Sequence, residues 1–265
     1  MTGGRARIAI AGASGRMGRA LIDAVGASSD LVLAAAFDVA GSPHVGDEVG
    51  GIVIGGDARA ALAGSDVLID FTRPEGTLAH LALCRELRIA AVVGTTGFDA
   101  AQKAQIAAHA EHVAIVMAPN MSIGVNVMLR LLDVAARAMA EGFDIEIVET
   151  HHRHKVDAPS GTALRMGEVI AAAQGSTLDA RAVTDRDGLR QPGAIGFASL
   201  RGGDIVGDHT ALFAGTGERI EITHRSTSRA TYAEGSLRAA RFLAGRERGL
   251  FGMAEVLGFA PLGAP

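Results

Sequence analysis

The 265-residue sequence is short of several residue types, and each shortage narrows the kind of protein it can be. Cysteine occurs once, at Cys84, and tryptophan is absent. Because one cysteine cannot form an intrachain disulfide, the composition fits a reducing compartment, and we expect a cytoplasmic protein. No apolar run approaches the ~18 residues of a membrane span. The short run after the N-terminal arginines is closed by Arg16, which indicates a buried strand rather than a signal peptide.

An excess of charge of one sign is also missing. The 25 basic and 29 acidic residues give a formal net charge of −4, which offers no general attraction for nucleic acid. Hydrophobic residues make up 48% and charged residues 20%, so the chain is globular rather than disordered, and it is long enough for one large domain or two modest ones. We therefore expect no membrane or nucleic-acid partner, and any positive patch must be local.

The first half of the chain alternates short apolar runs with segments of helical spacing. The runs lack polar alternation, as expected for strands that are buried on both faces. They are Arg7–Ala11, Leu31–Phe37, Val67–Phe71, Ala90–Val93 and Val113–Met117. Helical segments between them include Gly15–Val25, Glu75–Leu87 and Ala100–Ala110. This alternation predicts right-handed crossovers and an α/β fold with a Rossmann-like, doubly wound parallel sheet.

The pattern changes in the second half. The expected elements are a helix at Gly124–Met139, a strand at Phe143–Thr150, a helix at Thr162–Ala173 and β-like runs at Gly193–Arg201, Ile205–Ala214 and Glu218–Thr223. Gly202-Gly203-Asp204 and Gly215-Thr216-Gly217 join the last three runs, and short glycine links of this kind are typical of hairpins. We therefore predict a smaller α+β domain over residues 123–231, with a mostly antiparallel sheet. A helical tail, Tyr232–Leu257, is expected to return to the first domain, which then comprises 1–122 and 232–265.

A glycine-rich loop follows the first predicted strand and opens directly into a helix. Glycines at positions 12, 15 and 18 permit a tight turn and let backbone amides approach a pyrophosphate, whose charge the helix N-terminus favours. Asp38 lies 20 positions after Gly18 at the end of the second run, where its carboxylate can accept hydrogen bonds from the adenosine ribose. A simple strand-to-helix turn, with Asp38 as an ordinary strand-end residue, is the alternative.

The residues beside this loop bear on the choice of cofactor. A carboxylate at Asp38 repels a 2′-phosphate, and Val39 supplies no guanidinium to compensate for it. We predict that NADH binds at least as well as NADPH. Arg16 and Arg19 can still reach a phosphate, so the use of both cofactors stays open.

Other predicted strands also end in small polar groups, at the edge of the sheet where parallel sheets bind ligands. Thr72 follows one of them. Gly94 and Thr95 can pass close to a nicotinamide ring, and Asn120 can orient its amide. Each segment alone can be only a loop, but together they describe a cofactor cleft.

Three of the nine histidines lie in one stretch, THHRHKVDAPSGTA, which runs from Thr150 to Ala163. His152 and His154 alternate onto one side of an extended segment, which is acceptable geometry for metal ligands. However, Arg153 and Lys155 oppose a cation, and structural zinc usually has four nearby ligands, so we expect no metal. A solvated basic loop is the plain alternative.

An anion site with a proton donor fits this stretch better. Lys155 and the histidines supply positive charge and N–H groups. Ser160 is predicted to cap a helix whose first amides, at Gly161 and Thr162, can hold a carboxylate. This combination suits a small substrate with two carboxylates. A histidine or a lysine can protonate a carbon or a nitrogen after a hydride arrives.

These motifs together resemble the dihydrodipicolinate reductase family. The resemblance rests on GASGRMG, GTTG, APNMS, HHRHKVDAPSGTA and THRSTSR, and it covers essentially the whole chain. It implies the NAD(P)H-dependent reduction of 4-hydroxy-tetrahydrodipicolinate in diaminopimelate and lysine synthesis, by a homotetramer built through the sheet of the second domain. Family members with glutamate-arginine at the second strand end use that arginine for the 2′-phosphate, whereas this chain has Asp38-Val39.

The resemblance also assigns roles to individual residues. It implies that His151 is the catalytic proton donor or acceptor and that Lys155 is a second proton donor. The residues expected to bind substrate are His152, Ser160, Gly161 and Thr162. The residues expected around the dinucleotide are Gly12, Ala13, Ser14, Gly15, Arg16, Met17, Asp38, Gly94, Thr95, Thr96, Ala118, Pro119, Asn120 and Met121.

Two rival functions stay open. One is a different two-domain dehydrogenase, such as a semialdehyde or homoserine enzyme. Cys84 argues against the thioester chemistry of the former, because it lies in a helical pattern, LALCRELR. The other is a regulator that senses a dinucleotide without turnover, and such a protein would not need the cluster of proton donors.

The two halves of the predicted site lie in different domains, so we expect closure between the domains to assemble it. Arg225 and Arg229, in the THRSTSR motif, have no settled role. For Arg225, bracing of the sheet is the better explanation.

Overall fold

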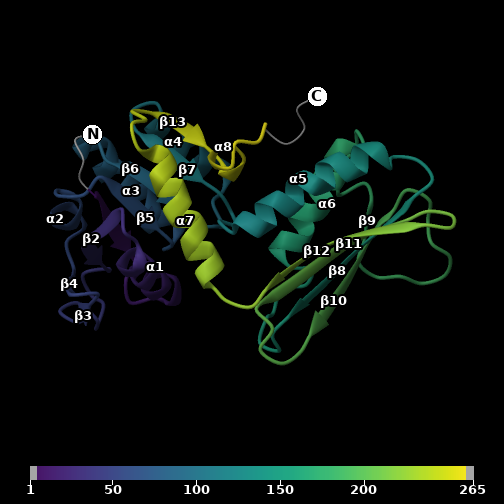
Figure 1. Cartoon of the computed structure of the whole chain (residues 1–265), viewed down its shortest axis with the longest axis horizontal. Coiled ribbons are helices and arrows are strands. Elements are labelled where there is room, and N and C mark those ends of the chain that lie inside the picture. The colour runs from purple at the N-terminus through teal and green to yellow at the C-terminus, as the bar shows by residue number, and fades with distance from the viewer. Residues whose placement is uncertain (1–4, 261–265) are drawn as a thin grey trace. The chain divides into compact units, whose positions relative to one another are not determined.

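The computed structural model describes residues 5–260, and these residues form two compact units (Figure 1). The first unit runs to Ile123 and resumes at Arg229–Gly258, and the second covers Gly124–Ser228 together with the described residues 259 and 260. The sequence places the two domain boundaries at 122/123 and 231/232. The predicted first domain also includes residues 1–4 and 261–265, which lie outside the described residues.

The first unit is built on one sheet. Its strands in the described chain lie in the order β13-β7-β6-β5-β1-β2-β4-β3, and all neighbouring pairs are parallel except β3 with β4. The strands are β1 Ala6–Ala11, β2 Leu31–Phe37, β3 Glu48–Val49, β4 Ile52–Gly55, β5 Val67–Asp70, β6 Ala90–Val93, β7 Ala114–Met117 and β13 Gly249–Phe251. The chain reverses its direction of travel across the sheet between β2 and β5, which confirms the Rossmann-like, doubly wound prediction.

Helices cover both faces of this sheet (Figure 1). They are α1 Arg16–Ala27, α2 Ala58–Leu62, α3 Pro74–Leu87, α4 Ala100–Ala110, α7 Ala230–Leu243 and α8 Met253–Val256. The buried side chains of α1 and α7 share one hydrophobic cluster, and those of α2, α3 and α4 share another. The two clusters lie on opposite faces of the strands.

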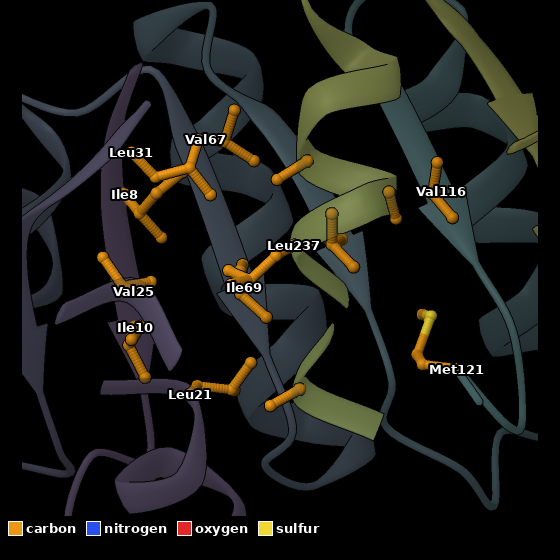
Figure 2. Packing of buried hydrophobic residues seen from close by; sticks show 14 of the residues in the cluster. Ile8, Ile10, Leu21, Val25, Leu31, Val67, Ile69, Val116, Met121 and Leu237 are labelled. Atoms are coloured by element: carbon orange, nitrogen blue, oxygen red, sulfur yellow. The ribbon is translucent and has the colours of Figure 1, made fainter. Parts of the chain in front are cut away.

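The first strand shows why these runs contain no polar alternation. Ile8 and Ile10 point into the cluster with α1 and α7, while Ala9 and Ala11 point into the opposite cluster, and all four are fully or almost fully buried. Figure 2 shows the first cluster, with Leu237 reaching from α7 onto the strands. Because successive side chains of a strand face opposite sides, a strand covered on both faces is apolar at nearly every position.

The prediction of a wholly helical tail was wrong at one point. Residues 249–251 form β13, which adds to the sheet by parallel pairing with Ala114, Ile115 and Val116 of β7. A strand of three residues that begins at Gly249 and is followed by Gly252 has no periodicity of its own, so its pairing with β7 determines its conformation. The short strands β3 and β4 escaped prediction for the same reason.

The second unit is a sheet with helices on one face. Its strands lie in the order β12-β11-β8-β10-β9 among the described residues. They are β8 Asp144–His151, β9 Ala182–Val183, β10 Ile195–Arg201, β11 Gly207–Ala214 and β12 Arg219–Ser226. The pairs β8–β11 and β11–β12 are antiparallel, and β10 pairs in parallel with β8 and β9. Helices α5 Ile123–Ala138 and α6 Gly161–Ala173 bury the core of this smaller α+β domain against one face of the sheet.

One of the two predicted hairpins was wrong. The link Gly202-Gly203-Asp204 does not join neighbouring strands, because β8 lies between β10 and β11. The link instead crosses the end of β8, where the Gly202 N–H donates to the His151 carbonyl at 3.0 Å and the Arg153 N–H donates to the Gly203 carbonyl at 3.2 Å. The other glycine link does form a hairpin, between β11 and β12. The crossing loop thus contacts the backbone of a predicted catalytic residue.

Within the described residues, every helix is too short or too polar to cross a bilayer.

Candidate active site

The glycine loop is closely packed against its own helix. Gly12 has a φ of +67°, and a Cβ at this position would lie 3.0 Å from Cγ2 of Thr72. A Cβ at Gly18 would lie 2.2 Å from the Gly12 carbonyl oxygen and 2.7 Å from Cα of Ala13. The first position therefore needs glycine for its backbone conformation and the second for its contact with the loop. A turn this tight brings the start of α1 directly behind β1, as pyrophosphate-binding loops require.

Asp38 is tied to this loop. Its Oδ2 accepts hydrogen bonds from the Ser14 hydroxyl and from the Ser14 N–H, the latter at 3.2 Å. Its Oδ1 accepts from the N–H of Val39 at 3.0 Å. The side chain of Val39 projects outward and is 73% exposed. The structure therefore brings the glycine loop and the predicted ribose acceptor into direct contact.

A pocket of about 730 Å³ lies against these groups. It is lined by Gly12, Ser14, Gly15, Phe37, Asp38, Val39, Phe71, Thr72, Arg73, Glu75, Gly76 and His80. These residues come from the carboxyl ends of β1, β2 and β5 and from the start of α3. The pocket therefore lies where the order of the strands reverses, which is the usual ligand site of such sheets.

A buried carboxylate that the sequence analysis missed organises the far side of this pocket. Asp70 is fully buried, and its Oδ1 accepts hydrogen bonds from the N–H and the hydroxyl of Thr72 at 2.9 and 2.6 Å. Its Oδ2 lies 2.7 Å from Nδ1 of His80. The hydroxyl of Thr95 accepts from the Thr72 N–H at 3.0 Å and from the Thr77 hydroxyl at 2.9 Å. An aspartate inside the apolar run VLIDF was the signal that could have found this network.

The predicted segments after β6 and β7 lie at the same edge of the sheet. A Cβ at Gly94 would lie 2.2 Å from the Phe71 ring, so glycine is required for that ring to pack over the segment. Thr95 is buried in the Asp70 network, and Thr96 is exposed. Met121 points into the hydrophobic core (Figure 2), so its side chain is turned away from any ligand at this edge.

The other predicted members of the cofactor site divide in a similar way. Ala13 and Ala118 are buried among hydrophobic residues, and only their backbone groups are available to a ligand. Arg16 and Pro119 are exposed, and Met17 is half-buried. Asn120 follows β7, and its Oδ1 accepts from the Ser122 N–H at 2.9 Å. The sequence thus identified the correct sheet edge, and the structure distinguishes side chains at its surface from those in the core.

The second unit places His151 at the end of β8 against a buried glutamate. Glu149 is 1% exposed, and its Oε2 lies 2.6 Å from Nδ1 of His151. Arg201, from β10, donates to both oxygens of Glu149 at 2.7 and 2.8 Å. Burial acts to raise the pKa of Glu149, but hydrogen bonds from Arg201 and His151 oppose it and lower the value to about 2. The carboxylate is therefore ionised at neutral pH.

Ser160 caps α6, as the sequence predicts, and it also has two further partners. Its hydroxyl accepts from the Ala163 N–H at 3.3 Å and lies 3.1 Å from Nε2 of His209, while its own N–H donates to Glu149 at 3.2 Å. Gly161 and Thr162 are the first two residues of α6. The backbone N–H groups of a first helical turn point out of the N-terminus, where the helix dipole favours an anion.

His209 is a member of this cluster that the sequence analysis did not single out. Its ring lies edge-on to that of His151, with centroids 5.0 Å apart. Burial, together with the positive charges of His151 and Lys155, lowers the pKa of His209 to about 4. The local sequence around His209, in a half-buried strand two residues after Gly207, does not indicate a role in the site. Only the pairing of β11 with β8 brings its side chain to His151.

The remaining basic groups of the motif lie on the loop after β8. Nζ of Lys155 lies 2.8 Å from Oδ1 of Asp157, and this hydrogen bond lowers the pKa of the Asp157 carboxyl. The rings of His152 and His154 lie 6.3 Å apart. In the part of the chain that the structure describes, no group of three or more His, Cys, Asp or Glu side chains could hold a metal ion. Arg225 lies outside this cluster and pairs with Asp208 on the neighbouring strand at 3.7 Å.

The fold and these two clusters define an α/β protein with a Rossmann-like dinucleotide-binding unit and a separate unit with a buried histidine-carboxylate pair. Two family models match this chain: "Dihydrodipicolinate reductase, N-terminus" over residues 6–121 and "Dihydrodipicolinate reductase, C-terminus" over residues 124–257. The chain belongs to the dihydrodipicolinate reductase family.

Individual relatives agree with this assignment. A protein from Aromatoleum aromaticum named 4-hydroxy-tetrahydrodipicolinate reductase is 60% identical over 262 residues, which cover 95% of each chain. One of the same name from Ralstonia nicotianae is 58% identical over 95% of this chain and 99% of its own. A dipicolinate-bound dihydrodipicolinate reductase from Paenisporosarcina sp. TG-14 has a structure that matches with a TM-score of 0.77 at 26% identity, over 95% of this chain and 98% of that chain.

Proposed function

We propose that the protein reduces 4-hydroxy-tetrahydrodipicolinate to tetrahydrodipicolinate with NADH or NADPH, in the synthesis of diaminopimelate and lysine. The observation that carries the proposal is the cluster at the end of β8, where a histidine paired with a buried carboxylate lies beside the N-terminus of α6. Relatives that are 56–60% identical carry the name of this activity and support the assignment.

The first unit is proposed to bind the dinucleotide, which supplies the hydride when it is bound. The crowded loop at Gly12 and Gly18 and the adjoining pocket fit a pyrophosphate and an adenosine. Asp38 would accept hydrogen bonds from the ribose hydroxyls. The segment of Gly94, Thr95 and Thr96 would lie close to the nicotinamide ring. The other proposed contacts are backbone groups of Ala13, Gly15, Met17, Ala118, Pro119 and Met121, together with the side chains of Ser14, Arg16 and Asn120.

NADH is proposed to bind at least as well as NADPH. The carboxylate of Asp38 is held by Ser14 at the edge of the pocket, where it would repel a 2′-phosphate. Val39 lines the same pocket without a charge. Arg16 is exposed near the loop and can still offer a guanidinium, so NADPH would remain a usable cofactor.

The second unit is proposed to bind the dicarboxylate. One carboxylate would be held by the N-terminus of α6, at Ser160, Gly161 and Thr162, and His152 and Lys155 would supply positive charge. The dipicolinate named for the structural relative from Paenisporosarcina is a ligand of this chemical class. Lys155 would have to leave Asp157 to reach a substrate, and its flexible side chain permits this exchange.

His151 and Lys155 are proposed as the proton donors of the reaction. The hydride and one proton reduce the ring, and the 4-hydroxyl group leaves as water, so the overall reaction consumes one proton for each reduced cofactor. His151 would donate or accept that proton, and Lys155 would be the second donor. A thioester mechanism is disfavoured, because burial and the nearby Asp70 raise the pKa of Cys84 to about 12.

A homotetramer is proposed to form through the sheet of the second unit. The face of this sheet opposite α5 and α6 exposes apolar side chains from adjacent strands, with Val148 37% and Leu200 50% exposed. Exposed apolar side chains on neighbouring strands of one sheet face support a subunit interface there. Light scattering should give a mass near four chains, and Val148→Lys with Leu200→Lys should lower it.

One assay separates the proposed reductase from its rivals. The purified chain would be mixed with NADH and the freshly generated condensation product of pyruvate and aspartate semialdehyde, and oxidation of NADH would be followed. Rapid oxidation that depends on this product supports the reductase. Binding of NADH without oxidation would instead support a dinucleotide sensor, and turnover only with a semialdehyde would support a different dehydrogenase.

Variants of the histidine loop test the assigned roles. His151→Gln should lower kcat by about 10²-fold with little change in NADH affinity, because it removes only the proton transfer. Lys155→Ala should damage both kcat and the KM for the dicarboxylate. His154→Gln, between these two positions on the exposed part of the loop, is the matched control and should retain near-normal kinetics. Equal losses in all three variants would favour a general basic loop over specific proton donors.

A further inference from the structure

Glu149 is a buried carboxylate to which the proposed reaction assigns no task. It lies on β8 two residues before His151, so the two side chains share the face of the sheet that α6 covers. Both of its oxygens are occupied by donors: His151 and Arg201 at Oε2, and Arg201 and the Ser160 N–H at Oε1. Because an ionised carboxylate can only accept, the shared proton of the His151 pair belongs to Nδ1 of the histidine.

This hydrogen bond determines which nitrogen of His151 can exchange a proton. A neutral imidazole carries one N–H, and either nitrogen can hold it. With Nδ1–H donated to Glu149 at 2.6 Å, the neutral ring has an unprotonated Nε2, and the protonated ring carries its additional proton there. A carboxylate behind a histidine fixes the orientation and tautomer of the ring in the same way in other enzymes.

The charged and titratable groups that face His151 come from β10, β11, β12 and the loop after β8. From β11 comes His209, whose pKa of about 4 leaves it neutral, and behind it on β12 burial also lowers the pKa of His224. Lys155 on the loop is paired with Asp157. The guanidinium of Arg201 faces Glu149 from β10 and neutralises part of its charge. Among the hydrogen bonds and ion pairs of the described residues, the carboxylate that pairs with the His151 ring is that of Glu149.

We propose that Glu149 is a positioning residue for the reaction proposed above, holding His151 with a proton on Nδ1 so that Nε2 exchanges a proton with the substrate. In the step concerned, the Nε2–H bond breaks as a bond from that proton to the reduced substrate forms, and the ring becomes neutral. Glu149 stays ionised throughout, and a proton from solvent restores Nε2–H. The identity of the substrate in this inference rests on the proposed function. The tautomer of His151 does not, because it follows from the hydrogen bond to Glu149.

The tautomer can be measured directly in the unaltered protein. Long-range ¹H–¹⁵N NMR of the full chain with labelled histidine reports which nitrogen of a neutral ring is protonated, and the signal missing from His151→Gln assigns His151. The expected result is Nδ1–H in the neutral ring. A neutral ring with Nε2–H would overturn the proposal. This measurement needs no turnover, so it gives its answer even if the proposed substrate proves wrong.

Two variants separate positioning from a merely structural role. Glu149→Gln and Arg201→Gln break the same ion pair but remove opposite charges. If Glu149 acts through His151, Glu149→Gln should lower kcat about tenfold or more and move the alkaline limb of the kcat–pH profile to lower pH, because the imidazolium loses its neighbouring anion. Arg201→Gln should move that limb to higher pH. The KM for NADH should change little in either variant.

A structural role predicts a different outcome. Both variants would then lower the thermal unfolding temperature and leave the alkaline limb where it is in the unaltered protein, and that result would overturn the proposal. Movement of the limb in the same direction in both variants would also overturn it. If neither variant folds, the tautomer of His151 measured in the unaltered chain decides whether the proposal stands.

Discussion

Oδ2 of Asp70 lies 2.7 Å from Nδ1 of His80, so a fully buried carboxylate at the end of β5 orients an imidazole ring on α3. The ring lies edge-on to Phe37, with centroids 5.0 Å apart, and it lines the pocket beside the glycine loop. The same carboxylate holds the backbone and hydroxyl of Thr72. One aspartate therefore fixes the side of the pocket that faces the proposed adenosine.

Asp70→Asn should weaken both the fold and dinucleotide binding. The amide cannot accept from Thr72 and His80 at once, so at least one buried donor loses its partner, at a cost of about 1–3 kcal/mol in the free energy of unfolding. We expect an affinity for NADH about tenfold lower, measured by calorimetry, because the His80 ring is released. Asp23→Asn, on the exposed side of α1, is the control and should change neither quantity. A normal affinity for NADH in Asp70→Asn would show that the orientation of His80 does not contribute to NADH binding.

Two glycines of α1 form a matched pair for testing the loop. A Cβ at Gly18 would lie 2.2 Å from the Gly12 carbonyl oxygen, whereas a Cβ at Gly26 would meet nothing within 4 Å. Gly18→Ala should therefore lower the free energy of unfolding by about 1–3 kcal/mol and abolish tight NADH binding. Gly26→Ala should raise the free energy of unfolding by about 0.5–1 kcal/mol, because alanine favours a helix. Urea titration measures both. Equal changes in the free energy of unfolding for the two variants would mean that the loop can move to accommodate a Cβ at position 18.

Much of the fold could be predicted because its strands are buried on both faces. The runs that became β1, β2, β5, β6 and β7 carry no polar residue except Arg7 near the start of β1 and Asp70 at the end of β5, a pattern that depends only on the local sequence. β3, β9 and β13 have three residues or fewer, and they exist because a neighbouring strand offers hydrogen bonds. No local pattern can report a partner that is distant in the chain.

The candidate site shows the same division between local and distant contacts. The position of Ser160 at the start of α6 follows from the sequence alone, since a serine before an apolar helical pattern is a capping signal. The contacts of His151 do not follow from it. They depend on β10 and β11 lying on either side of β8, which brings Arg201 and His209 to the same place. The predicted hairpin between β10 and β11 places these two strands side by side, so it excludes the arrangement in which β8 lies between them.

Val39→Arg should shift the cofactor preference toward NADPH. The substitution places a guanidinium beside Asp38 at the edge of the pocket, where it can pair with a 2′-phosphate. We expect the affinity for NADPH to rise by about tenfold while that for NADH changes little. Val53→Arg adds the same charge at another exposed position, on β4, and should leave both affinities unchanged. In the unaltered protein, an NADPH affinity tenfold or more above that for NADH would reject the predicted preference.

His209 should make the second unit sensitive to mild acid. Its pKa falls from an ordinary value of 6.5 to about 4 in the folded chain, mainly through burial, so the unfolded chain binds one more proton between these values. The free energy of unfolding should therefore fall as the pH drops from 6.5 toward 4, by at most about 1.4 kcal/mol per pH unit from this group. Above pH 6.5 both states are neutral and the contribution is constant.

The contribution of His209 can be isolated by comparing slopes. Urea titrations of His209→Gln across this range should show a shallower fall than those of the unaltered protein, because the glutamine does not titrate. His112→Gln removes an exposed histidine and should leave the slope as it is. If His209→Gln instead loses stability equally at every pH, the His209 ring contributes only its packing and its hydrogen bond to Ser160, and the predicted titration is wrong.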